Sequence, residues 1–90
     1  MNKKDLVDAV AESTGATRAN AGDAVNAVFG VISSSLASGN KVQVVGFGTF
    51  EVRRRAAGTA RNPRTGEAVN VPARNAPSFK AGKALKDAVN

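Results

Sequence analysis

The sequence predicts an α+β fold: two N-terminal helices, a three-stranded antiparallel sheet that extends into a long β-ribbon arm, and a short C-terminal helix. Two observations lead to this prediction. Apolar residues recur every three or four positions before Asn40 and alternate with polar residues after it, which is a change from helical to strand periodicity. A turn signal around Pro63 then divides a basic, strand-like region into the two strands of a hairpin.

The length of the chain limits it to one domain. Ninety residues, 42% of them hydrophobic, are enough for a single modest core, so residues 1–90 are expected to fold as one unit. A second domain is not expected. Within the domain we expect a helical part at 1–40, a sheet at 41–81 with its arm at 53–74, and the closing helix at 82–90.

The first two helices are predicted from their ends and their apolar stripes. Asn2 can cap the first helix, and Gly15 is placed to end it. Thr17 can cap the second helix, and Gly39 followed by Asn40 stops it. The apolar stripe of the second helix consists of Ala21, Val25, Val28, Ile32 and Leu36. These features predict an antiparallel helix pair.

The first two strands are predicted from alternation. "KVQVV" and "TFEVRRR" alternate apolar with polar residues, and "GFG" between them supplies a bend. Because successive side chains of a strand point to opposite faces, Arg53 and Arg55 should lie on the face opposite Phe50. The sequence therefore predicts a hairpin with one apolar face and one basic face.

The rest of the chain returns to the sheet and closes with a helix. "EAVNVPAR" resumes the strand pattern, and Leu85 and Val89 stand one turn apart in "FKAGKALKDAVN". Three lysines at three-residue spacing can share one side of this terminus: Lys80, Lys83 and Lys86.

Residues 53–74 form the predicted arm, which has little to bury. They hold six arginines against one acid, with Asn62, Pro63 and Gly66 in turn positions at the centre. From Arg53 to Pro63 an extended chain reaches about 33 Å at about 3.3 Å per residue, close to one turn of a DNA duplex at about 34 Å. A proline at the end of such a ribbon can act as an apolar wedge between base pairs. The alternative is a proline that only stiffens the turn.

Charge and composition limit the functions that the protein can have. The net charge is +6, and residues 46–90 carry the whole excess, with nine basic residues against three acidic ones. This one-sided charge predicts a polyanionic partner, either nucleic acid or an anionic membrane surface, and the alternative is a solvated basic face. Asp5, Asp8 and Glu12 interrupt the apolar residues near the N-terminus, so we expect no signal peptide or membrane span, and a cytoplasmic protein.

Catalytic and nucleotide-binding chemistry is not expected. The chain contains no Cys and no His, so it lacks thiolate ligands, the commonest metal ligand and the commonest general base. Ser33, Ser34 and Ser35 have no evident base and read as polar helix surface. The "AGKA" segment is not a phosphate-binding loop, because Ala84 stands where that loop needs Ser or Thr.

Three segments carry a resemblance to a known family. "VGFGTFEV", "RNPRTGE" and "FKAGKALKDAVN" stand in the order and spacing of the bacterial HU family of histone-like DNA-binding proteins, and the resemblance covers essentially all 90 residues. HU proteins are established examples of minor-groove architectural proteins. The resemblance implies an intertwined homodimer, with helices below, a saddle of β-sheet above, and two arms that wrap DNA.

The resemblance also implies roles for individual residues. The intercalating wedge falls on Pro63. The arm contacts to DNA fall on Arg53, Arg55, Arg61, Asn62, Arg64 and Arg74. The body contacts to DNA fall on Lys3, Lys80, Lys83 and Lys86. The dimer core falls on Phe47, Phe50 and Phe79, for which the alternative is an ordinary monomer core.

Two positions depart from the pattern of the family. Gly58 and Glu67 stand where relatives often have a basic residue, so the arm is less positive near its tip than in some relatives. Arg54 and Arg64 can compensate for the missing charge.

The predicted function is largely sequence-independent binding and bending of double-stranded DNA, including nicked or distorted DNA, by a nucleoid protein. No enzymatic activity, cofactor, metal, membrane or small-molecule substrate is expected. One alternative is a sequence-selective DNA bender similar to integration host factor. The other is an RNA-binding or ribosome-associated basic protein.

Overall fold

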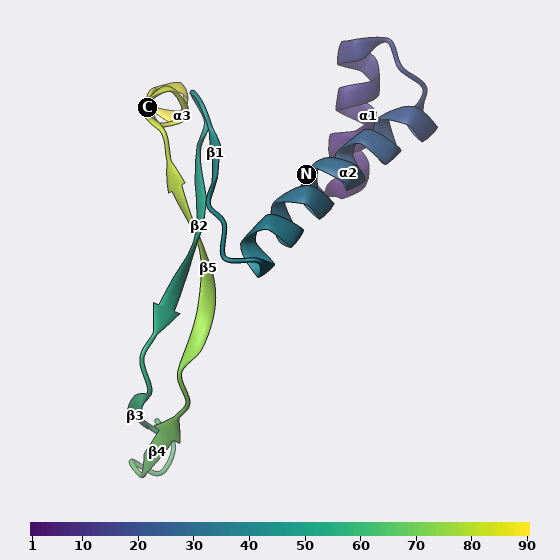
Figure 1. The fold of residues 1–90 in the computed structure, drawn as a ribbon. Helices are drawn as coiled ribbons and strands as arrows, with labels where there is room; N and C mark the ends of the chain where they lie inside the picture. Colours follow the sequence, from purple (N-terminus) through teal and green to yellow (C-terminus); the bar gives the residue numbers. More distant parts are fainter. The chain divides into compact units, whose positions relative to one another are not determined.

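The structure is a computed structural model that describes residues 1–90. The chain divides into two compact units, Met1–Ser34 and Ser35–Asn90. The first unit holds α1 (Lys3–Thr14) and most of α2 (Arg18–Ala37). The second holds β1 (Val42–Val44), β2 (Gly48–Arg55), β3 (Gly58–Arg61), β4 (Ala68–Val71), β5 (Arg74–Ala81) and α3 (Lys83–Val89). Figure 1 shows these elements along the chain.

The predicted helix ends are confirmed. The Oδ1 atom of Asn2 accepts a hydrogen bond from the backbone N–H of Asp5 at 3.0 Å, and an Asp5 carboxylate oxygen accepts one from the backbone N–H of Asn2 at 3.1 Å. This reciprocal capping box satisfies two free donors at the start of α1. Gly15 ends α1 in the left-handed region at φ 75°, and Thr17 Oγ1 accepts the N–H of Asn20 at the start of α2.

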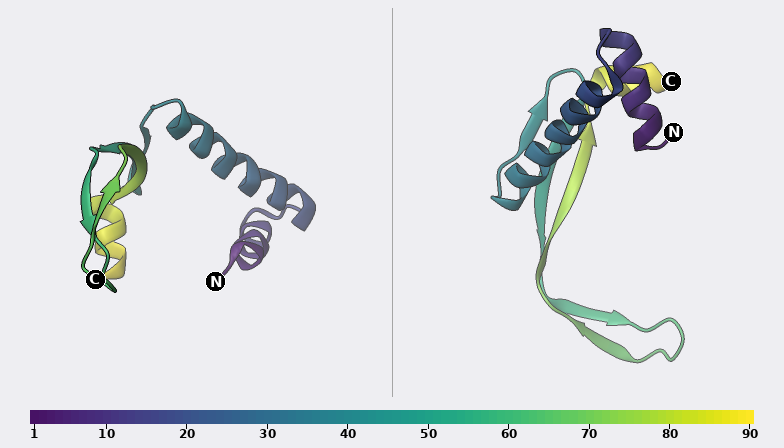
Figure 2. Two further views of the ribbon diagram at one scale, coloured as in Figure 1. Left: turned by 90° about the horizontal axis from the view of Figure 1, so that it is seen from below. Right: turned by 90° about the vertical axis from the view of Figure 1, so that its right-hand side faces the viewer.

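The first unit has a small core made where α1 meets the first half of α2. Ala11, Ala21 and Val25 are buried, and they are the three buried hydrophobic residues of the whole chain. An ion pair of 3.2 Å between Arg18 and Asp8 joins the two helices near their link. The two helices meet near their link but run at a wide angle to each other, and the later turns of α2 extend beyond α1, so they do not lie side by side as the expected antiparallel pair (Figures 1 and 2).

The second unit is built on a three-stranded antiparallel sheet in the order β1-β2-β5. β1 and β2 form the predicted hairpin, whose turn is closed by a 3.0 Å hydrogen bond from the N–H of Phe47 to the carbonyl of Val44. Gly46 occupies the turn position that requires positive φ, at 84°. β5 follows β2 over the full length of both strands, from Gly48 opposite Ala81 to Arg55 opposite Arg74.

The arm is not one continuous ladder. β3 and β4 form a separate two-stranded sheet, with Gly58 opposite Val71 and Arg61 opposite Ala68. The residues between the two sheets are unpaired, and they include Pro72, which has no N–H to donate to a ladder. The right-hand view of Figure 2 shows the ribbon turning sideways at this break. The predicted extension of the sheet into an arm is present, with a bend that the alternation pattern did not indicate.

Candidate nucleic-acid interface

The register of β2 and β5 collects three arginines on one face of the ribbon. Residues directly opposite each other in an antiparallel pair share a face, and Arg55 stands opposite Arg74. Arg53 lies two residues before Arg55 on β2 and therefore joins them, and all three side chains are exposed. Phe50 lies on the other face, as the alternation predicted.

The three arginines of this face differ in whether they have an acidic partner. Like charges directly opposite each other destabilise a sheet, and Arg55 and Arg74 form such a pair. Arg53 instead has a partner, because its Nη2 atom lies 3.4 Å from Oε1 of Glu51. Sequence reasoning did not single out Glu51, although its spacing of two residues from Arg53 placed both on one face. An anion above this face would meet two free arginines and one that is already paired.

The tip of the arm is a four-residue turn that exposes Pro63. The N–H of Asn62 donates to the carbonyl of Glu67 at 2.8 Å, and the N–H of Gly66 donates to the carbonyl of Asn62 at 2.7 Å. Gly66 has φ 73°, which explains a glycine at this position. The predicted turn at this point is therefore confirmed.

The two faces of the β3–β4 sheet also differ in charge. Arg61 lies opposite Ala68, and its guanidinium donates back to the carbonyl of Gly66 at 3.4 Å. Gly58 lies on the other face, together with Val69 and Val71. A basic residue at position 58 would therefore add charge to the apolar face and not to the face of Arg61. The departure at Gly58 leaves the charge of the Arg61 face unchanged.

The four lysines predicted to contact DNA lie outside the arm, three of them in the second unit and one in the first. Lys80 stands opposite Thr49 near the end of β5, and Lys83 and Lys86 lie on α3, all of them exposed. Lys3 is exposed at the start of α1, in the first unit. The second unit thus carries most of the predicted basic residues on one sheet, its arm and its closing helix.

The three phenylalanines named from the sequence lie together. Phe50 and Phe79 are directly opposite in the ladder, with ring centroids 4.8 Å apart, and the Phe47 and Phe79 centroids are 5.5 Å apart. Phe47 and Phe79 nevertheless remain 46% and 42% exposed. A Cβ atom on Gly48 would lie 2.6 Å from the Phe79 ring, so this glycine is needed for the close packing.

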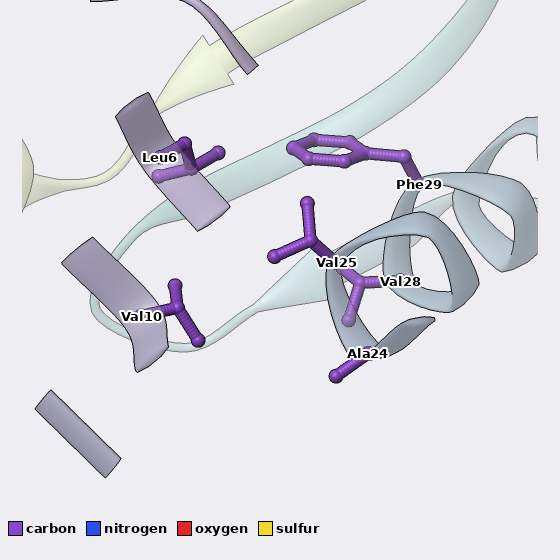
Figure 3. Close-up of a pocket in the computed structure, with 6 residues that line it drawn as sticks. All are labelled: Leu6, Val10, Ala24, Val25, Val28 and Phe29. Atoms are coloured by element: carbon purple, nitrogen blue, oxygen red, sulfur yellow. The ribbon is translucent and has the colours of Figure 1, made fainter. Parts of the chain in front are cut away.

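A second apolar surface was missed by the sequence reasoning. Figure 3 shows a groove in the first unit, where side chains of α1 and α2 face one another across open space. It is lined by Leu6, Val10, Ala24, Val25, Val28 and Phe29. Val28 and Phe29 are 55% and 49% exposed. Phe29 stands four residues after Val25, and this spacing was the available signal.

No helix of the structure combines the length and the apolar character that a membrane crossing requires. No group of three or more His, Cys, Asp or Glu side chains is placed to hold a metal ion.

The chain is similar to known proteins over nearly its whole length. It is 61% identical over 89 residues to DNA-binding protein HU of Staphylococcus aureus strain COL, and 56% identical to that of Geobacillus stearothermophilus, with 99% of each chain covered. Among solved structures, an HU–DNA cocrystal structure from Anabaena matches with a TM-score of 0.92 at 45% identity, covering 99% of this chain and 97% of that one. HU from Thermotoga maritima matches with a TM-score of 0.71 at 36% identity over the full length of both chains. Residues 1–90 also match the family described as bacterial DNA-binding protein, and the chain therefore belongs to that family.

Proposed function

We propose that this protein binds double-stranded DNA with little regard to sequence and bends it, as a homodimer with two arms. The observation that carries the proposal is the ribbon itself, with an arginine face at its base and an exposed proline at its tip. A relative of 45% identity whose structure was solved with DNA supports the choice of ligand. The bending step is inferred from the exposed Pro63 at the tip, because an apolar ring at the end of a ribbon can enter between base pairs.

Affinity comes mainly from phosphate contacts. Arg55 and Arg74 repel each other across the ladder, and a phosphate bound between them removes that cost while accepting charge-assisted hydrogen bonds. The proposed arm contacts are Arg53, Arg55, Arg61, Asn62, Arg64 and Arg74, and the proposed body contacts are Lys3, Lys80, Lys83 and Lys86. These side chains can contact a duplex of any sequence, because every step of the DNA backbone presents phosphates.

Bending comes from Pro63. Its ring is exposed at the end of a turn and has no N–H, so it presents a rigid apolar surface. Inserting such a ring between base pairs costs a few kcal/mol of unstacking, which the wedge contact and the additional phosphate contacts of bent DNA offset. Nicked or distorted DNA is favoured, because part of its stacking is already lost.

The homodimer is supported by the apolar surface that a single chain leaves uncovered. Only three hydrophobic residues are buried, while Val28, Phe29, Phe47 and Phe79 are each more than 40% exposed. Burying these surfaces against a second copy stabilises the fold at about 25 cal/mol per Å² of apolar area. Phe47, Phe50 and Phe79 then form the dimer core, and residues 1–90 act as one domain within the dimer. Two copies also supply the two arms that hold a duplex from both sides.

The protein acts in this proposal as an architectural component of the nucleoid in the cytoplasm, and not as an enzyme. Its effect on DNA needs no bond to be made or broken. No cofactor takes part in it.

Competition binding tests this function. We would measure affinity for several unrelated duplexes of equal length, for a nicked duplex, and for a double-stranded RNA of the same length at the same salt concentration. The expected result is similar affinity for all intact DNA duplexes, tighter binding to the nicked one, and weaker binding to RNA. A footprint confined to one sequence would favour a sequence-selective bender, and preference for RNA would contradict the choice of DNA.

A further inference from the structure

The turn that carries Pro63 is held together largely by one residue, Asn62. Its backbone N–H and carbonyl make the two hydrogen bonds that close the loop, at 2.8 Å to Glu67 and 2.7 Å from Gly66. Its side-chain Oδ1 accepts a third hydrogen bond, from the backbone N–H of Arg64 at 2.9 Å. Asn62 is also half-buried, whereas Pro63 and Arg64 are exposed.

The side-chain bond of Asn62 spans the proline. Pro63 lies between Asn62 and Arg64, and its ring fixes its own φ near −65°. The bond from Arg64 N–H to Asn62 Oδ1 restrains the rotation that remains, about the ψ of Pro63, in the way an Asx-turn mimics a backbone turn. Two further local restraints act on the other side of the loop, where Thr65 Oγ1 accepts the N–H of Glu67 at 3.3 Å and Gly66 takes a positive φ.

We infer that Asn62 is a positioning residue for DNA bending: it pre-forms the tip so that the Pro63 ring is already aimed before DNA arrives. The inference rests on the proposed wedge function of Pro63. It assigns the Asn62 oxygen to the turn, which leaves only the amide N–H groups of the side chain for a DNA contact. A wedge that is pre-ordered loses less conformational freedom on insertion, so bending is more complete at the same number of phosphate contacts.

Two substitutions separate positioning from direct contact. Asn62→Ala removes the acceptor and the amide donors together. Asn62→Ser removes the amide donors but keeps an oxygen that can accept the Arg64 N–H in an equivalent local turn. Asn70→Ala is the matched control, because Asn70 is an exposed asparagine of the same arm whose side chain makes no hydrogen bond.

The first readout is the free full-length protein. The chemical shift and temperature coefficient of the Arg64 amide report whether its N–H is hydrogen-bonded. We expect Asn62→Ala to shift this amide toward solvent-exposed values, and Asn62→Ser and Asn70→Ala to leave it close to the parent.

The second readout is the end-to-end distance of a labelled duplex in the bound complex. We expect Asn62→Ala to lose most of the bend and about twofold to tenfold in affinity, as for one local hydrogen bond. Asn62→Ser should keep most of the bend, and it should lose only the part of the affinity that the amide donors of Asn62 supply to DNA. In a Pro63→Ala background, Asn62→Ala should cause no further loss of bending, because the group it positions is absent.

Two results would overturn the inference, and they are distinguishable from each other. If Asn62→Ala and Asn62→Ser weaken binding equally while the Arg64 amide stays unchanged, Asn62 acts through its amide donors on DNA and not through the turn. If Pro63→Ala bends DNA like the parent, the proposed wedge itself is wrong and the positioning role falls with it.

Discussion

Gly48 matters for the packing of the second unit because it has no side chain. It is buried in β2, and an added Cβ atom would lie 2.6 Å from both the Phe79 ring and the Lys80 carbonyl. Contacts this short require the phenylalanine ring to leave its place beside Phe50.

The resulting prediction concerns stability. Gly48→Ala should lower the free energy of unfolding by about 1–3 kcal/mol, the usual cost of forcing extra volume into a packed site. Gly58→Ala is the control, because Gly58 lies in β3 with no heavy atom within 4 Å of an added Cβ. Thermal unfolding of both variants measures the difference. Equal midpoints for the two variants would contradict the packing described for Gly48.

Glu51 sets a second prediction at the residue scale. Its carboxylate lies 3.4 Å from the Arg53 guanidinium and competes with DNA phosphates for that charge. Glu51→Gln should therefore raise DNA affinity, by up to about fivefold, since exposed ion pairs are worth up to about 1 kcal/mol. The plot of log affinity against log salt should steepen by up to about one unit.

Glu12→Gln is the control for Glu51, because it changes net charge equally and Glu12 lies in α1 outside any ion pair. An Arg53→Ala background adds a test of mechanism. If Glu51→Gln raises affinity as much in that background as in the parent, Glu51 acts by general repulsion and not through Arg53.

At the scale of elements, the arm consists of two pieces with different support. The β2–β5 part is continuous with the phenylalanine cluster, whereas the β3–β4 part has only exposed or half-buried residues and no core of its own. A two-stranded sheet of this kind is marginal in water. The arm should therefore open locally with a low free energy beyond the break at Pro72.

Amide hydrogen exchange measures this difference. The amides of β3 and β4 should exchange much faster than those around Phe50 and Phe79, and DNA should slow the arm amides more than the others. Equal protection in β2–β5 and in β3–β4 without DNA would contradict the division of the arm into two pieces.

The elements that sequence alone predicted are those set by local chemistry. The caps at Asn2 and Thr17 and the turn around Pro63 depend on neighbours within a few residues, and the structure confirms them. The break at Pro72 was missed, because its effect depends on the register with the other strand of the ribbon. The pairing of Glu51 with Arg53 was also missed, since alternation places both on one face without showing which side chains meet.

Non-local features of the site were predicted less completely. The clustering of Phe47, Phe50 and Phe79 followed from the family resemblance and not from periodicity. The groove around Phe29 was missed, because Phe29 stands beside the apolar stripe and only the meeting of α1 with α2 shows that it remains open. The roles of the basic residues in DNA contact stay predictions.

At the scale of the whole molecule, the exposed apolar surface leads us to expect that stability depends on association. Phe29→Asp should place a charge in the apolar groove and shift the protein toward monomer or unfolded chain. Ser34→Asp is the control, because it adds the same charge to an exposed, polar position of the same helix. Sizing and thermal unfolding at several concentrations measure both. A parent protein that runs as a 9.2 kDa monomer would contradict the two-arm account.

Salt dependence tests the electrostatic part of the account. With about six phosphate contacts, affinity should fall about a thousandfold between about 50 and about 200 mM salt, at a slope of about −0.9 per contact. Arg61→Ala or Lys83→Ala should make the slope shallower by about one contact. A slope near zero in the parent would contradict phosphate neutralisation as the source of affinity.

The most direct test of the central claim is the bend itself, measured as the end-to-end distance of a doubly labelled duplex bound by the parent and by Pro63→Ala. The substitution keeps every arginine and lysine, so the salt slope should stay nearly unchanged. It removes the rigid ring proposed to enter between base pairs, so the bend and part of the preference for nicked DNA should be lost. A Pro63→Ala protein that bends intact DNA as strongly as the parent would contradict the account.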